Sequence, residues 1–233
     1  MIWLALIVLV VLFVLSRQWE PPPNKPLERQ PADHSKTFAN RAAVHEAGHT
    51  VTAWCCTLVP EIGDVTIEAE DGGATRMWLY SQDSHESRWC DMVIYLAGMA
   101  AEIAAFGKVK TRGCGPDIER ALSQAKKIAE SGNVTPPWKS PSRKKSLEFD
   151  KMIHSLDPQH AKVLSEGYRM AYSILEAHGN RFYKVVSVLL TKKTASSTDI
   201  EAVLGPRAFV KIMGIPVAAG WFKPTFIVPI AQA

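Results

Sequence analysis

Apolar and polar positions divide the chain into stretches of different kinds. The first fifteen residues, MIWLALIVLVVLFVL, contain no charged or strongly polar side chain. Farther on, apolar runs with helical spacing are separated by short connections that contain Gly and Pro, a pattern typical of a helical domain. We expect helices over the ranges 37–57, 84–106, 117–131, 160–177, 180–190 and 197–204.

Two short stretches between the first two of these helices predict a β-hairpin. Residues 65–67 and 75–80 have strand character, and they flank the turn sequence Asp-Gly-Gly at 71–73. Gly107 is expected to end the helix at 84–106. Glycine and proline at 113–116 predict a loop just before the helix at 117–131. The sequence therefore indicates a mainly α fold with a small β-hairpin.

The apolar run at the N-terminus is expected to be a membrane anchor. As a helix it would extend ~22 Å, short of the ~30 Å hydrocarbon core, and Trp3 and Trp19 flank it as interfacial residues do. A cleaved signal peptide is the alternative, but it needs a basic segment before the run and a small-x-small cleavage site, and the sequence offers neither. Basic residues follow the run, so the positive-inside rule places the rest of the chain in the cytoplasm. We expect a single-pass membrane protein with residues 1–16 as the transmembrane helix.

Proline marks the boundaries of the folded domain. Pro21-Pro22-Pro23, Pro26 and Pro31 indicate a semi-rigid linker over 17–36. The domain itself is expected to span 37–204. Prolines spaced through 205–233 forbid a long helix there, so this stretch is expected to be a C-terminal tail.

Composition narrows the class of protein. A length of 233 residues with 47% hydrophobic and 21% charged residues suits one or two folded domains and excludes a disordered chain. A net charge of +4 is weak support for nucleic-acid binding. The basic run at 139–145 lacks interleaved aromatic residues, so we expect no nucleic-acid partner. The adjacent Cys55 and Cys56 suit reduced thiols in the cytoplasm better than a disulfide scaffold.

The motif that carries chemistry is His45-Glu46-Ala47-Gly48-His49. On a helix, residues four apart share a face, so both imidazoles can reach one metal ion. Zinc lowers the pKa of a bound water toward ~7 and polarises a scissile carbonyl. Glu46 would take the proton of that water and pass it to a leaving amine. The alternative is a pair of helix-surface histidines without a metal, but apolar neighbours indicate a buried helix, where polar groups need partners.

Two questions follow from this motif. Gly48 inside a helix costs about 1 kcal/mol relative to Ala, so we expect another element or the substrate to approach closely there. A zinc site also needs a third protein ligand. The downstream candidates are Glu102, Cys114 and Asp117, and spacing alone leaves Glu102 and Asp117 nearly equal, while Cys114 is either an inert thiol or a softer ligand.

The stretch from about Phe38 to Leu204 resembles the protease domain of the FtsH family of membrane-anchored, ATP-dependent zinc proteases. The similarity rests on VHEAGH at 44–49, on the hairpin ending at 75–80, on LAGMAAE at 96–102, on GPDIERA at 115–121 and on the closing helices. The resemblance implies a mostly helical domain that assembles as hexamers.

The resemblance also implies the roles of particular residues. The zinc ligands would be His45, His49 and Asp117, the aspartate lying at the start of its helix, and Glu46 would be the catalytic base. The strand formed by Thr75, Arg76, Met77 and Trp78 would line the cleft and pair with an extended protein or peptide substrate.

One departure from the family concerns its ATPase module. FtsH-type enzymes carry this module between the anchor and the protease domain, where about twenty residues stand here, too few for such a domain. No G-x-x-x-x-G-K-[ST] phosphate loop occurs in the sequence. The family's Gly-Arg in the second motif is Gly98-Met99 here, a lesser change.

We therefore expect a membrane-anchored zinc endopeptidase that cleaves flexible or already unfolded proteins without ATP. A folded substrate would need a separate ATPase as partner. The alternative is a non-catalytic, membrane-tethered adaptor of FtsH-type hexamers. The presence of Glu46 argues against the adaptor, because a binding module has no need of a general base.

Overall fold

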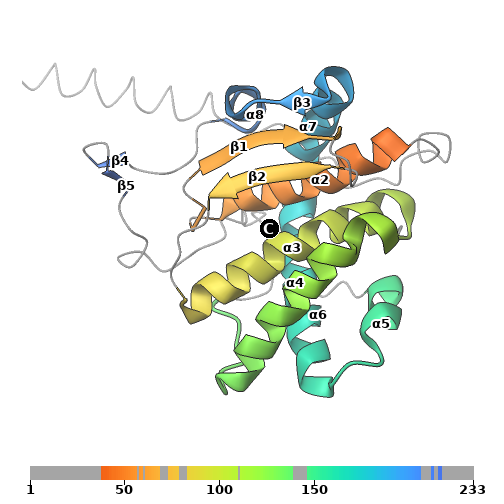
Figure 1. Cartoon of the computed structure of the whole chain (residues 1–233), viewed down its shortest axis with the longest axis vertical. Helices are drawn as coiled ribbons and strands as arrows, with labels where there is room; N and C mark the ends of the chain where they lie inside the picture. The colour runs from red at the N-terminus through yellow and green to blue at the C-terminus, as the bar shows by residue number, and fades with distance from the viewer. Residues whose placement is uncertain are drawn as a thin grey trace, which may run out of the picture.

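A computed structural model describes residues 38–56, 58–59, 61–68, 73–78, 83–109, 111–138, 146–205, 211–212 and 215–216. This part of the chain is mainly helical and carries a small sheet (Figure 1), so the predicted fold class is confirmed. The predicted transmembrane helix at 1–16 and the linker at 17–36 lie outside the described residues, as does most of the tail at 205–233.

The predicted helices are present, with shifted ends. They are α2 (Phe38–Cys55), α3 (His85–Phe106), α4 (Thr111–Glu130), α6 (Pro158–Ala177), α7 (Gly179–Lys192) and α8 (Ser197–Leu204). A further short helix, α5 (Leu147–Ile153), was not predicted. The strands are β1 (Glu61–Thr66), β2 (Ala74–Trp78), β3 (Thr194–Ala195), β4 (Lys211–Ile212) and β5 (Ile215–Pro216).

The predicted hairpin forms part of a three-stranded antiparallel sheet with the order β2-β1-β3. Thr75 of β2 lies opposite Val65 of β1, and Val65 in turn lies opposite Ala195 of β3. The register between β1 and β2 is irregular between Ile62 and Val65. The turn predicted at 71–73 falls outside the described residues except for Gly73. Because β1 is the central strand, β2 is an edge of this sheet.

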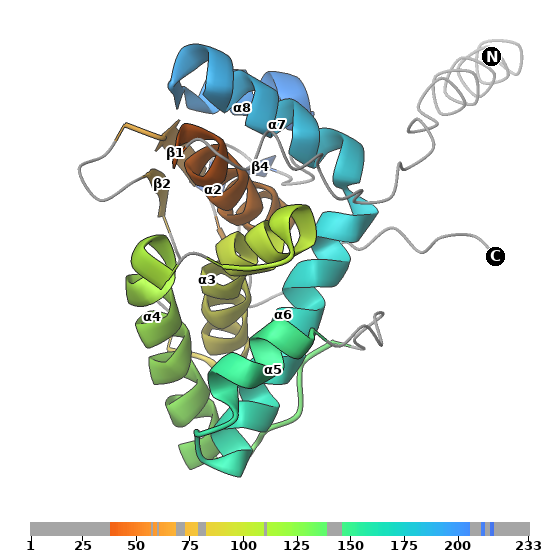
Figure 2. The same ribbon diagram turned by 90° about the vertical axis from the view of Figure 1, so that its right-hand side faces the viewer.

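Helix α3 is the core helix of the domain. Ser84 caps its first turn in a reciprocal pair of hydrogen bonds with Ser87, and Gly107 ends it, as predicted, with a left-handed φ of 72°. Figures 1 and 2 show α3 between α4 and α6, and it also packs against α2. Of the helices that the structure describes, α3 is the one whose length and apolar composition would suffice to cross a membrane; here most of its residues are buried inside the domain.

Small residues let α2 approach the backbone of α3 closely. A Cβ at Gly48 would lie 2.6 Å from the carbonyl oxygen of Ala97 and 2.8 Å from Cβ of Ala101. No side chain fits at those distances without a shift of the helix backbone. The prediction that another element approaches Gly48 is therefore confirmed, and that element is α3.

The prediction of a loop at 113–116 is wrong. Helix α4 already begins at Thr111, so Gly115 and Pro116 lie inside it and Asp117 is not at its start. Proline holds φ near −65°, which a helix accepts close to its N-terminus at the cost of one backbone hydrogen bond. Glycine and proline interrupt helices in general, but here they occupy the first turns of one.

Candidate metal centre

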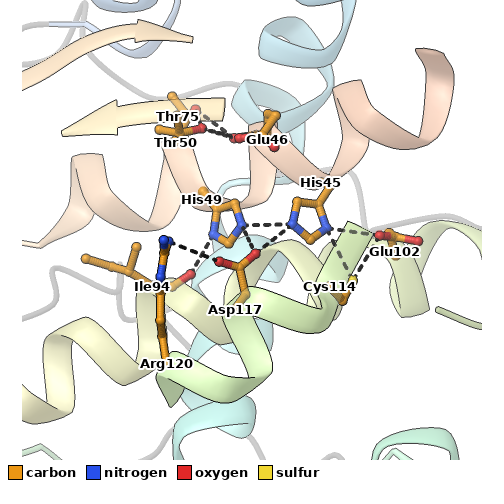
Figure 3. Close-up of polar contacts among 10 residues, drawn as sticks. All are labelled: His45, Glu46, His49, Thr50, Thr75, Ile94, Glu102, Cys114, Asp117 and Arg120. Carbon is orange, nitrogen blue, oxygen red and sulfur yellow. Dashed lines mark hydrogen bonds and ion pairs between the residues drawn. The ribbon is translucent and has the colours of Figure 1, made fainter. Parts of the chain in front are cut away.

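Helices α2 and α4 bring the two histidines and Asp117 together (Figure 3). His45 and His49 lie one turn apart on α2, with ring centroids 4.6 Å apart, and both are buried. His45 Nε2 lies 2.9 Å from His49 Nε2 and 3.0 Å from Asp117 Oδ2, and His49 Nε2 lies 3.1 Å from Asp117 Oδ2. Three atoms that can bind a metal therefore converge on one point.

The other nitrogen of each imidazole faces an acceptor. His49 Nδ1 lies 2.7 Å from the carbonyl oxygen of Ile94, and His45 Nδ1 lies 2.9 Å from Glu102 Oε1. A carbonyl and a carboxylate accept hydrogen bonds, so we assign the proton of each neutral imidazole to Nδ1. Both Nε2 atoms then carry lone pairs that point at each other and at a carboxylate, an arrangement that a metal cation, or a proton in its absence, would stabilise.

The pKa shifts of His45 and Asp117 also indicate that the cluster favours a positive charge. Burial lowers the pKa of His45, but its contacts with Asp117, Cys114 and Glu102 outweigh burial, and the net pKa is well above the usual value. Burial raises the pKa of Asp117, but the two histidines lower it by more, so it is ionised. The site attracts positive charge. Four ligands about 2.0–2.1 Å from one zinc ion lie about 3.3 Å apart, close to the spacing here, so the residues present fit a zinc ion.

Glu102 and Cys114, the other two candidates for a third ligand, lie on the far side of His45. Cys114 Sγ lies 3.6 Å from His45 Nδ1 and donates to Glu102 Oε1 at 3.3 Å. Glu102 Oε2 accepts from Arg41 at 3.3 Å. Both carboxylate oxygens are thus occupied within the protein. Of the two acids that spacing left nearly equal, Asp117 faces the Nε2 atoms of both histidines, and Glu102 is placed to orient one of them.

Sequence reasoning missed two parts of this cluster. Arg41 lies one turn before His45 on α2, a spacing that could have indicated a shared face. Gly98 of α3 leaves room for the imidazoles, since a Cβ there would lie 2.6 Å from Nε2 of both His45 and His49. The sequence places Gly98 in the LAGMAAE motif, which supports the family resemblance but does not indicate that this glycine contacts the histidines.

Glu46 lies on another side of α2, against strand β2 (Figure 3). Its Oε2 accepts a hydrogen bond from Thr75 Oγ1 at 2.7 Å, and it is buried. Of the residues predicted to bind substrate, Thr75 therefore contacts the predicted base. Arg76 is exposed and Met77 is half-buried, and Trp78 ends β2 with its side chain outside the described part of the chain.

Comparison with known proteins identifies the family. The family model of peptidase family M41 matches residues 34–203. The ATP-dependent zinc metalloprotease FtsH 1 of Thermomicrobium roseum is 26% identical over 198 residues, which cover 75% of this chain and 30% of that protein. FtsH of Rickettsia typhi is 29% identical over 185 residues, covering 71% of this chain and 29% of that protein.

FtsH of Parabacteroides distasonis is 26% identical over 201 residues, which are 76% of this chain and 27% of that protein. The chain thus spans less than a third of the length of these curated relatives. The resemblance to an FtsH protease domain, inferred from its motifs, is confirmed. With the family model covering most of the chain, this protein belongs to peptidase family M41.

Proposed function

We propose that the domain is a zinc-dependent endopeptidase that hydrolyses peptide bonds in unfolded or flexible proteins. The observation that carries the proposal is the convergence of three electron-pair donors, from His45, His49 and Asp117, within 3.1 Å of one another. Glu46 follows the first of them directly. Two structural histidines would need neither a facing carboxylate nor an adjacent buried glutamate, whereas a hydrolytic site needs both.

We assign zinc, the metal in the names of the relatives, to His45, His49 and Asp117. When bound, zinc supplies Lewis acidity that lowers the pKa of water toward 7 and polarises the scissile carbonyl. Glu46 accepts the proton of the attacking water and delivers it to the leaving amine nitrogen. Glu102 and the carbonyl of Ile94 hold the two imidazoles in the tautomer that presents Nε2.

The proposed substrate is an extended chain. Strand β2 pairs with β1 along one edge, and no described strand pairs with its other edge. The backbone groups of that edge can add a peptide as a further strand, with Thr75, Arg76, Met77 and Trp78 as the residues that bind it. A folded protein cannot present such a segment, which is why we propose unfolded or flexible substrates.

Further parts of the proposal concern the whole protein. Residues 1–16 would anchor it in a membrane, with the protease domain on the cytoplasmic side, and the chains would assemble as a homo-oligomer, a hexamer by resemblance. The sequence contains no G-x-x-x-x-G-K-[ST] phosphate loop, so we propose that this chain cleaves unfolded substrates without ATP. Folded substrates would depend on a separate ATPase partner.

The test measures zinc content and casein hydrolysis by the purified full chain, with and without ATP. We expect roughly one zinc per chain and cleavage that ATP does not change. Glu46→Gln should keep the zinc and lower kcat by at least about 100-fold, since a general base contributes about 10²–10⁴-fold. The control is Glu130→Gln, which neutralises an exposed glutamate at the end of α4.

Two results would contradict the proposal. A chain that binds zinc but cleaves nothing, and that co-purifies with an ATPase, would favour the adaptor function. A Glu46→Gln variant as active as the wild type would exclude the mechanism while leaving the metal site in place.

A further inference from the structure

The carboxylate of Glu46 is held from two directions, by strand β2 and by the residue just before it. Thr75 Oγ1 lies 2.7 Å from Glu46 Oε2, and it also lies 3.3 Å from the backbone oxygen of Glu46 and 3.4 Å from Thr50 Oγ1. Thr50 Oγ1 donates its own proton to the backbone oxygen of Glu46 at 2.7 Å. A threonine hydroxyl has one proton to donate. The shortest contact therefore takes it, and Thr75 donates to the carboxylate.

Gly73 lies against the other side of the same carboxylate. A Cβ at this position would lie 2.6 Å from Glu46 Oε1, 2.8 Å from its Cγ and 3.0 Å from its Cδ. All three atoms belong to the Glu46 side chain and none to the backbone. The missing side chain at position 73, just before β2, thus leaves the space that the carboxylate occupies, while Thr75, two residues farther along the chain, donates the hydrogen bond.

We propose that Thr75 and Gly73 are positioning residues for the general base. Their role rests on the proposed function, in which Glu46 moves the protons of the hydrolysis. Glu46 has three side-chain torsions, and its backbone lies on α2 rather than on β2. Without the Thr75 hydroxyl and the space at Gly73, these torsions would leave the carboxylate in several orientations, of which few face the attacking water.

The strand that orients the base is also the strand proposed to bind the substrate. Thr75 acts through its side chain, whereas pairing with an extended peptide uses the backbone of β2. The two roles can therefore be separated by substitution. Loss of the Thr75 hydroxyl should lower kcat and leave KM nearly unchanged, because the backbone groups that pair with a peptide remain.

The first test compares Thr75→Val with Thr75→Ser in hydrolysis of an unstructured fluorogenic peptide. We expect Thr75→Val to lower kcat by about 10- to 100-fold with less than a threefold change in KM, since a misplacement near 1 Å can cost on the order of 10²-fold. Thr75→Ser restores the hydroxyl and should stay within about threefold of the wild type. Zinc content should be unchanged in both variants.

Thr66→Val is the matched control on the neighbouring strand. The Thr66 hydroxyl accepts hydrogen bonds from Thr194 Oγ1 and from the backbone nitrogen of Glu68, so its loss also removes side-chain hydrogen bonds from the sheet. Its hydrogen bonds among the described residues do not include Glu46. Equal losses of kcat in Thr66→Val and Thr75→Val would mean that the hydroxyls only stabilise the sheet, and the inference would be overturned.

Gly73→Ala tests the second contact by a different route. The added methyl group should displace the carboxylate while the fold persists, because the displaced atoms end a flexible side chain. We expect a kcat at least tenfold lower, with zinc content and Tm close to those of the wild type.

Wild-type kcat in both Gly73→Ala and Thr75→Val, with activity still lost in Glu46→Gln, would overturn this inference alone. A wild-type chain without hydrolysis would overturn the proposed function and this inference with it.

Discussion

The two sides of helix α2 are built differently. On one side, His45 and His49 face helices α3 and α4, and the partners of their Nδ1 atoms are buried within the domain. On the other side, Glu46 faces the edge strand β2, which contributes the Thr75 hydroxyl, and Gly73, which comes just before that strand. Helix packing holds the proposed metal ligands, whereas the proposed base is held by an edge strand and the glycine before it. Metal retention and turnover should therefore be separable by mutation.

The largest effect on the histidine side is expected from Gly98→Ala. A Cβ at Gly98 would lie 2.6 Å from Nε2 of both histidines, and α3 cannot retreat because it packs against α2, α4 and α6. Overpacking of this kind costs about 1–3 kcal/mol. We expect the variant to lose its zinc as well as its activity, as measured by metal analysis and peptide hydrolysis.

Gly115→Ala is the control for this prediction. Apart from its chain neighbours and the backbone of its own helix, no described atom lies within 4 Å of a Cβ at Gly115, which is also helical and lies two residues from Asp117. Alanine favours a helix more than glycine does, but the ring of Pro116 opposes a Cβ on the residue before it, so we expect only a small change in the stability of α4. Full zinc content in Gly98→Ala would show that the imidazoles have more freedom than the packing indicates.

A smaller effect on the same side is expected from Glu102→Gln. Glutamine keeps the shape of the side chain but removes the charge that Arg41 and His45 both contact. Loss of a carboxylate that orients a metal-binding histidine typically costs 10- to 100-fold in metal affinity. We expect zinc competition with a chelator to reveal a weakening of this size. With saturating zinc, kcat should fall less than in Glu46→Gln, and zinc affinity equal to that of the wild type would contradict the role given to Glu102.

The smallest effect is expected from Asp91→Asn, which touches neither side of α2. Burial raises the pKa of the Asp91 carboxyl from 3.8 to about 6, and Lys127 lowers it by less. A folded-state pKa above the unfolded one means that stability falls as the pH rises from about 4 to about 6. Asparagine keeps the acceptor for Gln124 but has no charge to bury.

We expect Asp91→Asn to raise the free energy of unfolding at pH 7.5 by about 1–2 kcal/mol, less than the roughly 3 kcal/mol of an unscreened shift because the side chain is only partly buried. At pH 3.5 the two proteins should be alike. Urea unfolding at both pH values measures this, with Asp64→Asn as an exposed control. A gain of equal size at pH 3.5 would refute the electrostatic cause. Activity should not change.

Much of the fold followed from local signals in the sequence. Gly107 and the apolar run before it correctly predicted the end of α3, and Gly48 correctly predicted a close neighbour. The start of α4 did not follow, because Gly115 and Pro116 have the same local preferences in a loop as in the first turns of a helix. The short strand β3 was also missed, since two residues carry no periodicity of their own.

The candidate site was predictable where its residues are close in sequence. His45, Glu46 and His49 share one helix, and the spacing of four correctly predicted that the two histidines share a face. The distinction between Asp117 and Glu102 needed the relative placement of three helices, which no spacing determines. The domain bounds at 37–204 and the roles of the site residues stay predictions that the experiments above address.

The pairing of β1 with β3 has a consequence for the order in which the domain assembles. Thr66 and Thr194 are 128 positions apart in the chain, yet their hydroxyls lie 2.8 Å apart. Contacts of such high sequence separation form late, because a long loop must close first. The sheet can be completed only after nearly the whole domain has been synthesised. In a nascent chain, β1 and β2 would thus remain a two-stranded hairpin until the last part of the domain emerges and β3 adds the third strand.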